Sequence, residues 1–515
     1  MALTLTAEQK SIYEIFSGKS KYIIPPYQRA YSWDKEQCAE LFEDIKNAFL
    51  INEDEGYFIG NIVIAKSSEE KEFLEVIDGQ QRLITLTLFL KVLSEFDASN
   101  DALDDAIWVK DRRDRSKKEQ RVQTRVFEDK DSIFLLEVLN KNSKEICAKS
   151  TKNRFIKNIC LFHSELEKLQ KDSKIEDFAN FILDKVTLLP IESTDTNQNK
   201  AREKALKIFE TINNRGKPLN DSDIFKANLY SMALSKLEHK AFIDRWIQLD
   251  TECDNIQLKG FDIVRVFKIY SYVVRGLQKI ETSEINLRDF FIKKEYSPFK
   301  TKNHNEVMDD LFDILEAIKF YESKVIDIND NNQLSKWFQL IDIYTNNYPK
   351  DFLIVFLYKN KNREQNIEEY LNFSKSLVRY CYFEGSTTNI KFTIFRWTVD
   401  VIHGDWIVYY PKKYNVEEHE FLGRLYKGFG LLSNYLDNNI KAIYPYKIKR
   451  LRDITKYKYP DYSYYDKVGH TVVTDIHGKV LEEYDFSSFD EKSYNQRINN
   501  IKNKFIKFFR NPNED

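Results

Sequence analysis

The hydrophobic pattern between residues 73 and 93 changes from that of a strand to that of a helix. A short apolar run ends at Asp78-Gly79, and leucines then recur at the spacing of one helical face, at Leu83, Leu86, Leu90 and Leu93. The polar residues of the junction are Asp78, Gln80, Gln81 and Arg82. Free backbone N–H groups in a helix's first turn bind anions, and Gly79 lets the backbone approach such a ligand. This junction is therefore predicted to bind phosphate or another anion.

A simpler interpretation is a turn and a helix N-cap, with Arg82 on the surface. A second segment, residues 21–33, makes it less favoured. This segment carries a double proline followed by Gln28-Arg29 and two aromatic residues. Prolines fix their own φ angles and bias the preceding residue away from helix. The segment is therefore predicted to be extended and stiff.

Periodicity predicts further elements in the first half of the chain. Helices are expected over residues 6–16, with Thr6 and Gln9 at capping-box spacing, and after Asp34. The apolar stripe of the second helix is predicted to be buried and consists of Cys38, Leu41, Phe42, Ile45 and Phe49. Strands are expected over residues 57–65 and 72–77. Residues 95 to about 188 are predicted to form a helical insertion, with an apolar segment over residues 178–188 at its end, before the chain returns to the first domain.

The segment after the insertion predicts two helices joined by a turn. The first runs through Phe209 and breaks at residues 213–216, and Asp221 or Ser222 can cap the second. A helix-turn-helix corner explains the pattern as well as a ligand site does. Residues 236 to about 440 then show helical spacing, with helices expected over residues 261–274, 307–321, 334–344 and 352–358. An amphipathic helix over residues 494–509 closes the chain.

Length and composition change this picture little. A chain of 515 residues predicts two or three domains, and 42% hydrophobic with 31% charged residues is typical of a soluble globular protein. No apolar run reaches the roughly 18 residues of a membrane span, and the N-terminus lacks a signal-peptide pattern. We therefore expect a cytoplasmic protein without a membrane partner.

Charge and cysteine content exclude some classes of site. The net charge of −2 gives no global attraction to nucleic acid, and the basic run over residues 111–125 is more typical of a solvated surface than of a phosphate contact. Five cysteines without a CxxC pair argue against a disulfide framework and against a zinc knuckle.

Four blocks follow one another along the chain: Ile24-Pro25-Pro26-Tyr27-Gln28-Arg29 with Tyr31-Ser32-Trp33; Phe58-Ile59-Gly60-Asn61-Ile62-Val63; Asp78-Gly79-Gln80-Gln81-Arg82; and Phe209-Glu210-Thr211-Ile212-Asn213-Asn214-Arg215-Gly216 with Pro218-Leu219 and Asp223-Ile224-Phe225-Lys226. Together they resemble the N-terminal domain of GmrSD-type modification-dependent restriction endonucleases. The resemblance covers residues 10 to 235 and, more loosely, the helical remainder.

The resemblance implies an α+β fold, with a small ParB-like or sulfiredoxin-like mixed α/β domain followed by a mostly helical domain. We expect a nucleotide-binding domain over residues 1–235 with its helical insertion over about 95–188. A helical domain is expected over residues 236–445 and a degenerate HNH-like or accessory tail over residues 446–515.

In this family the front domain is commonly followed by an HNH or His-Me finger nuclease, which needs a histidine base and Mg²⁺. Residues 431–436 and 445–448 resemble the segment before its histidine motif, but residues 449–454 lack the histidine. Further on, His470, Asp475 and His477 are weak candidates for metal ligands or a base. A non-catalytic tail is favoured over a working nuclease.

The resemblance implies a protein of a bacterial anti-phage or modification-dependent restriction system that binds and hydrolyses an NTP. Arg29 and Arg82 are expected to bind phosphate, and Asp78, Gln81 and Arg82 are the predicted catalytic residues. The remaining predicted nucleotide contacts are Gln28, Gly60, Asn61, Gly79, Gln80, Asn213, Arg215 and Lys226. The nucleotide, GTP, ATP, UTP or CTP, is expected to come with Mg²⁺.

Two alternatives remain open: a catalytically inactive DNA-binding adaptor, and a DNA endonuclease with an atypical C-terminal histidine site. Gln and Arg suit base edges as well as phosphates, so composition does not decide between them. The expected partners are DNA, including modified phage DNA, and an effector nuclease subunit. Apolar helical faces permit a homo-oligomer without requiring one.

Overall fold

The structure of the protein is a computed structural model. It describes residues 5–51, 55–67, 72–111, 117–126, 130–148, 153–172, 175–213, 221–233, 235–281, 284–327, 333–344, 346–361, 366–384, 387–411, 426–437, 445–455, 471–482 and 484–512. The chain forms two compact units, Met1–Ile243 and Asp244–Asp515, which are described separately below. The predicted division into three domains stays a prediction.

A mixed seven-stranded sheet forms the centre of the first unit. Its strands are β1 (Leu5–Ala7), β2 (Lys10–Ser11), β3 (Lys21–Ile24), β4 (Tyr57–Ser67), β5 (Phe73–Asp78), β8 (Val122–Thr124) and β9 (Val186–Asp195). They lie in the order β1-β9-β4-β5-β3-β8, and β2 also pairs with β9. β4 runs parallel to β9 and antiparallel to β5, whereas β3 is parallel to both β5 and β8. The proline segment follows β3 directly, which places it beside the end of β5.

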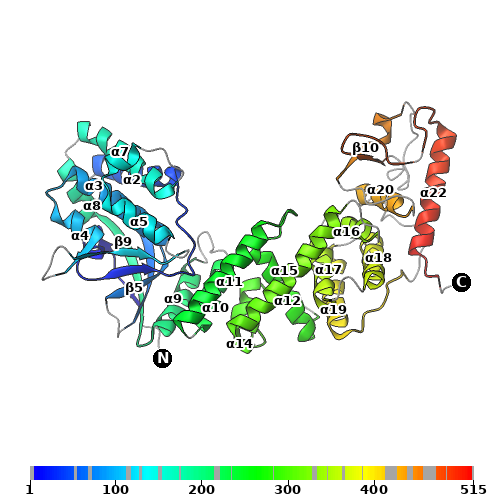
Figure 1. Ribbon diagram of the computed structural model, residues 1–515, viewed down its shortest axis with the longest axis horizontal. Helices are drawn as coiled ribbons and strands as arrows, with labels where there is room; N and C mark the ends of the chain where they lie inside the picture. Colours follow the sequence, from blue (N-terminus) through cyan, green and yellow to red (C-terminus); the bar gives the residue numbers. More distant parts are fainter. Residues whose placement is uncertain are drawn as a thin grey trace. The chain divides into compact units, whose positions relative to one another are not determined.

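The helices of the first unit cover both faces of β4. They are α1 (Ile12–Ile15), α2 (Lys35–Ile51), α3 (Gln80–Phe96), α4 (Asp101–Ile107), α5 (Lys130–Asn140), α6 (Ser143–Cys147), α7 (Arg154–Asp172), α8 (Ile175–Lys185), α9 (Gln198–Asn213) and α10 (Asp221–Met232). Ile62 and Ile64 belong to the core formed with α2, α3, α7 and α8. Val63 and Ala65 are buried as well, and α9 packs against β4, β5 and β9. Figure 1 shows α2, α3 and α7 gathered beside the strands.

Helix α3 is buried around most of its circumference, because aromatic side chains of several helices meet on it. Phe89 of α3 lies 5.5 Å from Phe42 of α2 and 5.0 Å from Phe162 of α7, measured between ring centroids. The predicted apolar stripe of α2 (Cys38, Leu41, Phe42, Ile45 and Phe49) is confirmed as buried. Helix α3 therefore anchors the predicted anion-binding junction in the core of the unit.

The expected helix over residues 6–16 is wrong. Leu5–Ala7 and Lys10–Ser11 are strands paired antiparallel with β9, and only Ile12–Ile15 are helical. The capping box forms between Ser11 and Glu14 instead of between Thr6 and Gln9. Pairing with a strand far along the chain overrides the local helical pattern.

The helical insertion is also corrected. Residues 95–188 include α4 to α8, but also β8 of the main sheet and a two-stranded sheet of β6 (Trp108–Lys110) and β7 (Lys118–Gln120). The apolar segment at its end leaves the helix after Lys185 and enters β9. A short apolar run does not distinguish a buried strand from a buried helix.

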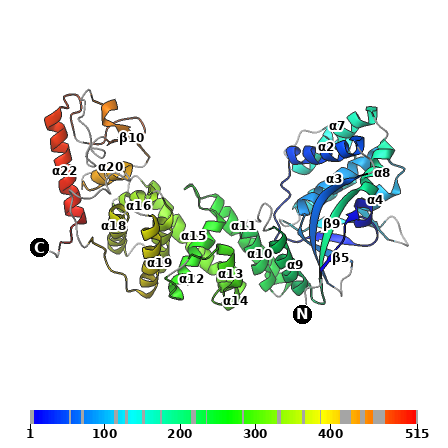
Figure 2. The same ribbon diagram turned by 180° about the vertical axis from the view of Figure 1, so that it is seen from behind.

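The second unit is mostly helical. Its helices are α12 (Ile263–Leu277), α13 (Leu287–Lys293), α14 (Pro298–Thr301), α15 (His304–Ile326), α16 (Leu334–Asp342), α17 (Tyr348–Lys359), α18 (Ile367–Glu384), α19 (Thr387–His403), α20 (Tyr426–Tyr435) and α22 (Glu491–Phe509), and α11 (Lys236–Asp254) crosses the boundary between the units. The four helices expected between residues 261 and 358 are confirmed. Figure 2 shows this unit from behind.

A small antiparallel pair of strands precedes the last helix. β10 (Tyr446–Arg450), followed by a short 3₁₀ turn (Leu451–Asp453), pairs with β11 (Thr471–Asp475). The predicted apolar face of the closing helix is confirmed, because Ile498, Ile501, Phe505 and Phe508 are buried. With a mixed sheet in the first unit and a mostly helical remainder, the predicted α+β fold class is confirmed. The likeness to ParB or sulfiredoxin stays a prediction.

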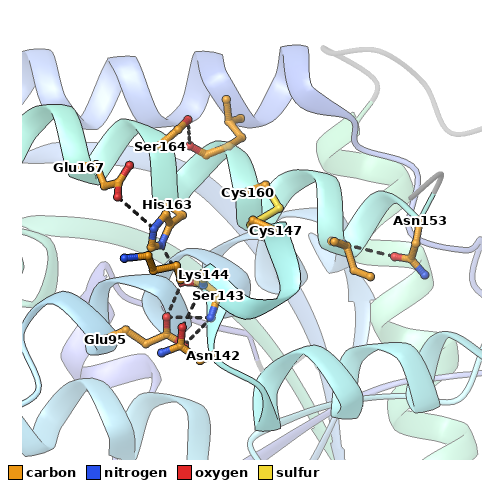
Figure 3. Close-up of a disulfide and its surroundings, with 12 residues drawn as sticks. Glu95, Asn142, Ser143, Lys144, Cys147, Asn153, Cys160, His163, Ser164 and Glu167 are labelled. Carbon is orange, nitrogen blue, oxygen red and sulfur yellow. Dashed lines mark hydrogen bonds and ion pairs between the residues drawn. A yellow bond between two sulfur atoms is a disulfide. The ribbon is translucent and has the colours of Figure 1, made fainter. Parts of the chain in front are cut away.

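Cysteine chemistry differs from the expectation drawn from spacing. Cys147, at the end of α6, forms a disulfide with Cys160 of α7, whose Cα atom lies 5.4 Å away (Figure 3). Cys38, Cys253 and Cys381 are free and buried. The packing of α6 beside α7 brings together two cysteines that are 13 residues apart, and no sequence spacing marks such a pair.

Four polar residues lie beside the disulfide (Figure 3): Ser143, His163, Glu95 and Glu167. Ser143 Oγ is 2.7 Å from His163 Nδ1, and it donates its proton to Glu95. Glu95 also accepts the Ser143 backbone N–H at 3.0 Å, so it caps the first turn of α6. Ser143 is buried, which makes this cluster a helix anchor rather than a nucleophilic site.

In the described part of the chain, no helix is long and apolar enough to cross a bilayer.

Candidate functional site

The junction between β5 and α3 requires a glycine. β5 ends at Asp78, α3 begins at Gln80, and Gly79 between them has φ of +88°. A Cβ atom at Gly79 would lie 2.5 Å from Ile62 Cγ2 of the neighbouring strand β4. Both the left-handed backbone and the close approach of β4 therefore exclude other side chains here. The predicted strand-to-helix junction is confirmed.

A pocket of about 100 Å³ opens at this junction. The segment after β3 contributes Gln28, Arg29 and Trp33, the junction contributes residues 77–82, and α10 contributes Asp223. Residues from three of the four sequence blocks thus meet at the start of α3. The free N–H groups of that helix's first turn lie at the same place.

Gln81 holds the segment that carries Arg29. Its side-chain oxygen accepts the Ser32 N–H at 2.7 Å and the Trp33 N–H at 3.3 Å, and its Nε2 donates to the Ala30 carbonyl oxygen at 3.1 Å. Both ends of the buried amide are therefore engaged by the backbone. Gln81 positions this wall of the pocket, and its predicted catalytic role stays a prediction.

Gln28 also fixes this segment, through a bond to the end of β5. Its Nε2 donates to the carbonyl oxygen of Ile77, the residue before Asp78, at 2.8 Å. The segment and the end of β5 are thereby joined through a side chain that the sequence predicted as a nucleotide contact. Arg29 follows immediately and is exposed, so its guanidinium is accessible to a ligand.

Arg82 extends from the first turn of α3 toward β4. Its Nη1 donates to the carbonyl oxygen of Asn61. Gly60 lies next to this guanidinium, because a Cβ atom there would contact Arg82 Cζ at 3.4 Å, and its φ of +132° is a backbone conformation that favours glycine. The predicted residues Gly60 and Asn61 thus contribute through their backbone to the position of Arg82.

Asp78 is a partly buried carboxylate that feels the charges of Arg82 and Arg29. Burial raises its pKa above the ordinary value, while Arg82, the Gly79 N–H and Arg29 act in the opposite direction. A carboxylate whose charge is penalised by burial gains from a nearby cation. Gln80 beside it is buried, and its Oε1 has no hydrogen-bond partner in the described part of the chain. A buried carbonyl without a partner costs free energy that a ligand could recover.

Comparison with protein families assigns this part of the chain. Residues 12–230 match the family described as GmrSD restriction endonuclease, N-terminal domain. The resemblance inferred from the sequence blocks is confirmed for these residues, which we call the GmrSD domain after the matched family, and the pocket lies within them. A search of curated proteins finds no match.

The strand that ends at the pocket of the GmrSD domain also carries a buried ion pair, which the sequence did not predict. Arg202 of α9 binds Glu75 of β5 with Nε and, at 2.8 Å, with Nη2. Tyr27 and Gln198 also donate to Glu75, at 2.5 Å and 2.8 Å. The available signal was a charged residue inside an apolar strand, at Leu74-Glu75-Val76.

This network connects the segment of Tyr27 and strand β5 with helices α9 and α10. Tyr27 precedes Gln28 and Arg29 directly, and its ring lies 5.0 Å from that of Tyr230 on α10. The guanidinium of Arg202 lies 5.5 Å from each of these two rings. Burial alone would raise the pKa of Glu75, but Arg202 and the hydrogen bonds around it bring the pKa below its ordinary range.

The remaining predicted site residues lie apart from the pocket or outside the described residues. Lys226 is buried on α10 and is not part of the pocket wall, whereas Asp223 of the same helix is. Asn213 is the last residue of α9, and its side chain lies outside what the structure describes. Arg215 falls outside the described residues as well.

The candidate histidine site of the tail gains no support. His470 lies outside the described residues. Asp475 accepts the backbone N–H groups of His477 at 2.9 Å and Lys479 at 2.8 Å, so it closes a turn after β11. Within the described residues, no group of three or more His, Cys, Asp or Glu side chains is arranged to hold a metal ion. The non-catalytic tail stays the favoured prediction, and a nuclease in this tail stays the untested alternative.

Proposed function

We propose that the GmrSD domain of this chain binds a nucleoside triphosphate at the Asp78–Arg82 pocket and hydrolyses it. The observation that carries the proposal is the meeting of Arg29, Arg82 and the first turn of α3 around one small pocket. Guanidinium groups and a helix N-terminus are the groups that bind phosphate best. Phosphoryl transfer depends mainly on positioning and on stabilising the charge that develops, and these groups supply both.

The size of the pocket favours a phosphate end as its occupant. A volume of about 100 Å³ is well below the roughly 300 Å³ or more of pockets that enclose a drug-sized ligand. The pocket therefore accommodates a terminal phosphate, with the sugar and base outside it. Selection among GTP, ATP, UTP and CTP would then depend on contacts beyond the pocket.

A magnesium ion fits the donor set of the pocket. Mg²⁺ prefers carboxylate oxygens and phosphate oxygens, and Asp78 and Asp223 both line the wall. The raised pKa of Asp78 reflects a partly buried charge that a cation would stabilise. When bound, the ion would neutralise charge on the phosphates. Gln80 would contribute its partnerless carbonyl to a water or to a ligand donor.

The wider role that we propose is in a DNA restriction system directed against phage. The family name refers to a restriction endonuclease, which supports DNA as a partner. In this proposal nucleotide hydrolysis regulates DNA recognition or cleavage, and a nuclease subunit or the tail would make the cut. The adaptor alternative, in which Gln-Arg pairs contact base edges, is less favoured because backbone groups already engage the amides of Gln28 and Gln81.

The deciding experiment measures phosphate release from GTP, ATP, UTP and CTP by the full chain, with and without DNA. Arg82→Ala is expected to reduce release about 100-fold, because it removes a charged donor from the transition state. Arg245→Ala is the matched control, since Arg245 forms an ion pair in the second unit at 2.6 Å from Asp309 and should not affect release.

Two results would contradict the proposal. One is equal phosphate release by the Arg82→Ala variant. The other is an absence of release together with an absence of any thermal shift on addition of the four nucleotides. In that second case, DNA affinity that falls steeply with salt and does not depend on nucleotide would favour the adaptor.

A further inference from the structure

A pocket of about 500 Å³ lies in the second unit, along one face of α12. Arg265, Lys268, Tyr272 and Arg275 of α12 line it at helical spacing. The segment before α13 contributes Glu284, the start of α17 contributes Asn347, and α19 contributes Phe395. The pocket is therefore built from four elements of one unit, and its volume is in the range of small-molecule sites.

Two cations of this wall share a single carboxylate. Arg265 Nη2 lies 2.7 Å from Asp351 Oδ1, and Lys268 Nζ lies 3.6 Å from Asp351 Oδ2. Asp351 is fully buried, whereas Lys268 is about one-third exposed. One negative charge cannot neutralise both cations, so this part of the pocket carries excess positive charge.

Arg275 adds a further cation deeper in the wall. The residue is 2% exposed, and its guanidinium carbon lies 4.6 Å from the ring centroid of Phe395. The carboxylate of Glu284, which lines the same pocket, is already bound by Lys391 and accepts the Tyr348 hydroxyl at 3.2 Å. Glu284 is therefore compensated by a cation of its own. The other acidic residue of the wall, Asp262, accepts the Arg265 backbone N–H at 2.9 Å as the N-cap of α12.

Two further features of the wall favour an anion. Tyr272 is buried, and its hydroxyl has no hydrogen-bond partner in the described part of the unit. Asn347 is the N-cap of α17, a helix of 12 residues, and its side chain makes no capping bond. The first N–H of the helix, that of Tyr348, donates to Asn346 Oδ1 at 3.2 Å, and the next residue is a proline. A helix N-terminus carries partial positive charge, and a buried hydroxyl without a partner is a donor that a ligand could engage.

We propose that this pocket binds a small phosphate monoester. Lys268 and Arg275 would bind the phosphate, Tyr272 would donate its hydroxyl to it, and Phe395 would contact the organic part. A phosphate offers three terminal oxygens to several donors, which matches two cations and a hydroxyl better than a carboxylate does. The proposal does not depend on the function proposed for the GmrSD domain.

The test is titration calorimetry of the full chain with phenyl phosphate, which combines a phosphate dianion with one aromatic ring. Lys268→Gln is expected to weaken binding about tenfold, the equivalent of one charge-assisted hydrogen bond. Tyr272→Phe should weaken it several-fold without loss of stability, because the hydroxyl has no partner to lose. Lys300→Gln is the matched control, since Lys300 has the same exposed side-chain fraction of 36% as Lys268 but lies on α14, outside the pocket wall.

Further titrations test whether phenyl phosphate binds at this pocket and whether the pocket prefers phosphate. Unchanged affinity in Arg82→Ala together with the loss in Lys268→Gln supports this pocket. Loss in Arg82→Ala with unchanged affinity in Lys268→Gln would assign the binding to the GmrSD domain and overturn the proposal. Equal binding of benzoate would overturn the preference for phosphate, and an absence of saturable heat with phenyl phosphate would overturn the site itself.

Discussion

Gly79 combines two constraints that are usually separate. Its backbone is left-handed, and its missing side chain leaves space that Ile62 of β4 occupies. Gly18 shares the first constraint, with φ of +71°, but no atom lies within 4 Å of the position of its absent Cβ. A comparison of substitutions at these two glycines therefore separates the cost of the left-handed backbone from the cost of the clash with Ile62.

We predict that Gly79→Ala destabilises the GmrSD domain more than Gly18→Ala does. The left-handed backbone should cost each variant about 1 kcal/mol, and the clash with Ile62 should add about 1–3 kcal/mol at Gly79. Urea denaturation of both variants measures the difference. Equal free energies of unfolding would show that β4 moves away without cost.

Asp78 should make the ligand-free protein less stable at neutral pH than an uncharged residue would. Its pKa is raised in the folded state, so its stabilising contribution is present below the ordinary carboxyl pKa of about 3.9 and is lost as pH rises through the raised value. Asp78→Asn is therefore expected to gain stability relative to the parent protein between pH 4 and pH 7, while phosphate release falls.

Asp490 provides a control, because its pKa is shifted in the opposite direction to that of Asp78. Its pKa is lowered by the Ser493 backbone N–H at the start of α22, so its contribution is present above the ordinary pKa and is lost as pH falls. Asp490→Asn should therefore be less stable than the parent from pH 4 to pH 7, and this deficit should shrink as pH falls below the ordinary pKa of about 3.9. Stability is measured by urea denaturation at each pH. If Asp78→Asn were also less stable than the parent, with a deficit that shrinks below pH 4, the assignment for Asp78 would be contradicted.

At the scale of elements, the Glu75–Arg202 pair joins strand β5 to helix α9. Glu75→Gln at neutral pH should cost about 3–5 kcal/mol, because it leaves Arg202 buried without its charge partner. Since the pKa of Glu75 is lowered, this cost is expected to shrink as pH falls through the carboxyl range. Unfolding monitored by circular dichroism measures it.

The matched control for this pair lies in the same sheet. Glu192 of β9 faces Lys66 of β4 at 3.9 Å, and both side chains are partly exposed. Glu192→Gln should change stability by less than about 1 kcal/mol, as is usual for exposed pairs. A similar loss in both variants would mean that burial does not determine the strength of the Glu75 pair.

The sequence predicted the elements whose pattern is local. Helix α2 was identified from Asp34 and its apolar stripe, and Asp34 accepts the Glu36 N–H at 3.1 Å as an N-cap does. Strands β1, β2 and β9 were missed because each depends on a partner far along the chain. The pattern of a short apolar segment such as residues 186–191 is the same in a strand and in a buried helix.

The site was predictable in part for the same reason. The junction at Gly79 has a local signature, and the pocket does bring Gln28, Arg29 and Arg82 to it. The role of Gln81 depends on backbone atoms about fifty positions earlier, as its bonds to Ser32 and Ala30 show. Asp223 and Arg202 likewise reach the site only through packing of α9 and α10.

At the scale of the whole molecule, the chain contains two units with separate cores. We predict two calorimetric transitions, of which Glu75→Gln lowers only one. Gly276→Ala should lower the other, because a Cβ atom on α12 would lie 2.9 Å from Ile402 Cβ of α19. A single transition shifted by both variants would show that the units unfold together.

The short strands β1 and β2 determine how the GmrSD domain can be isolated. The family match begins at residue 12, after both strands, yet each pairs with β9. A fragment cut at Ile12 would leave one side of β9 with unsatisfied N–H and C=O groups, and such an edge recruits strands from other copies. Aggregation of that fragment would then reflect the exposed edge of β9, even where the Asp78–Arg82 pocket itself is intact.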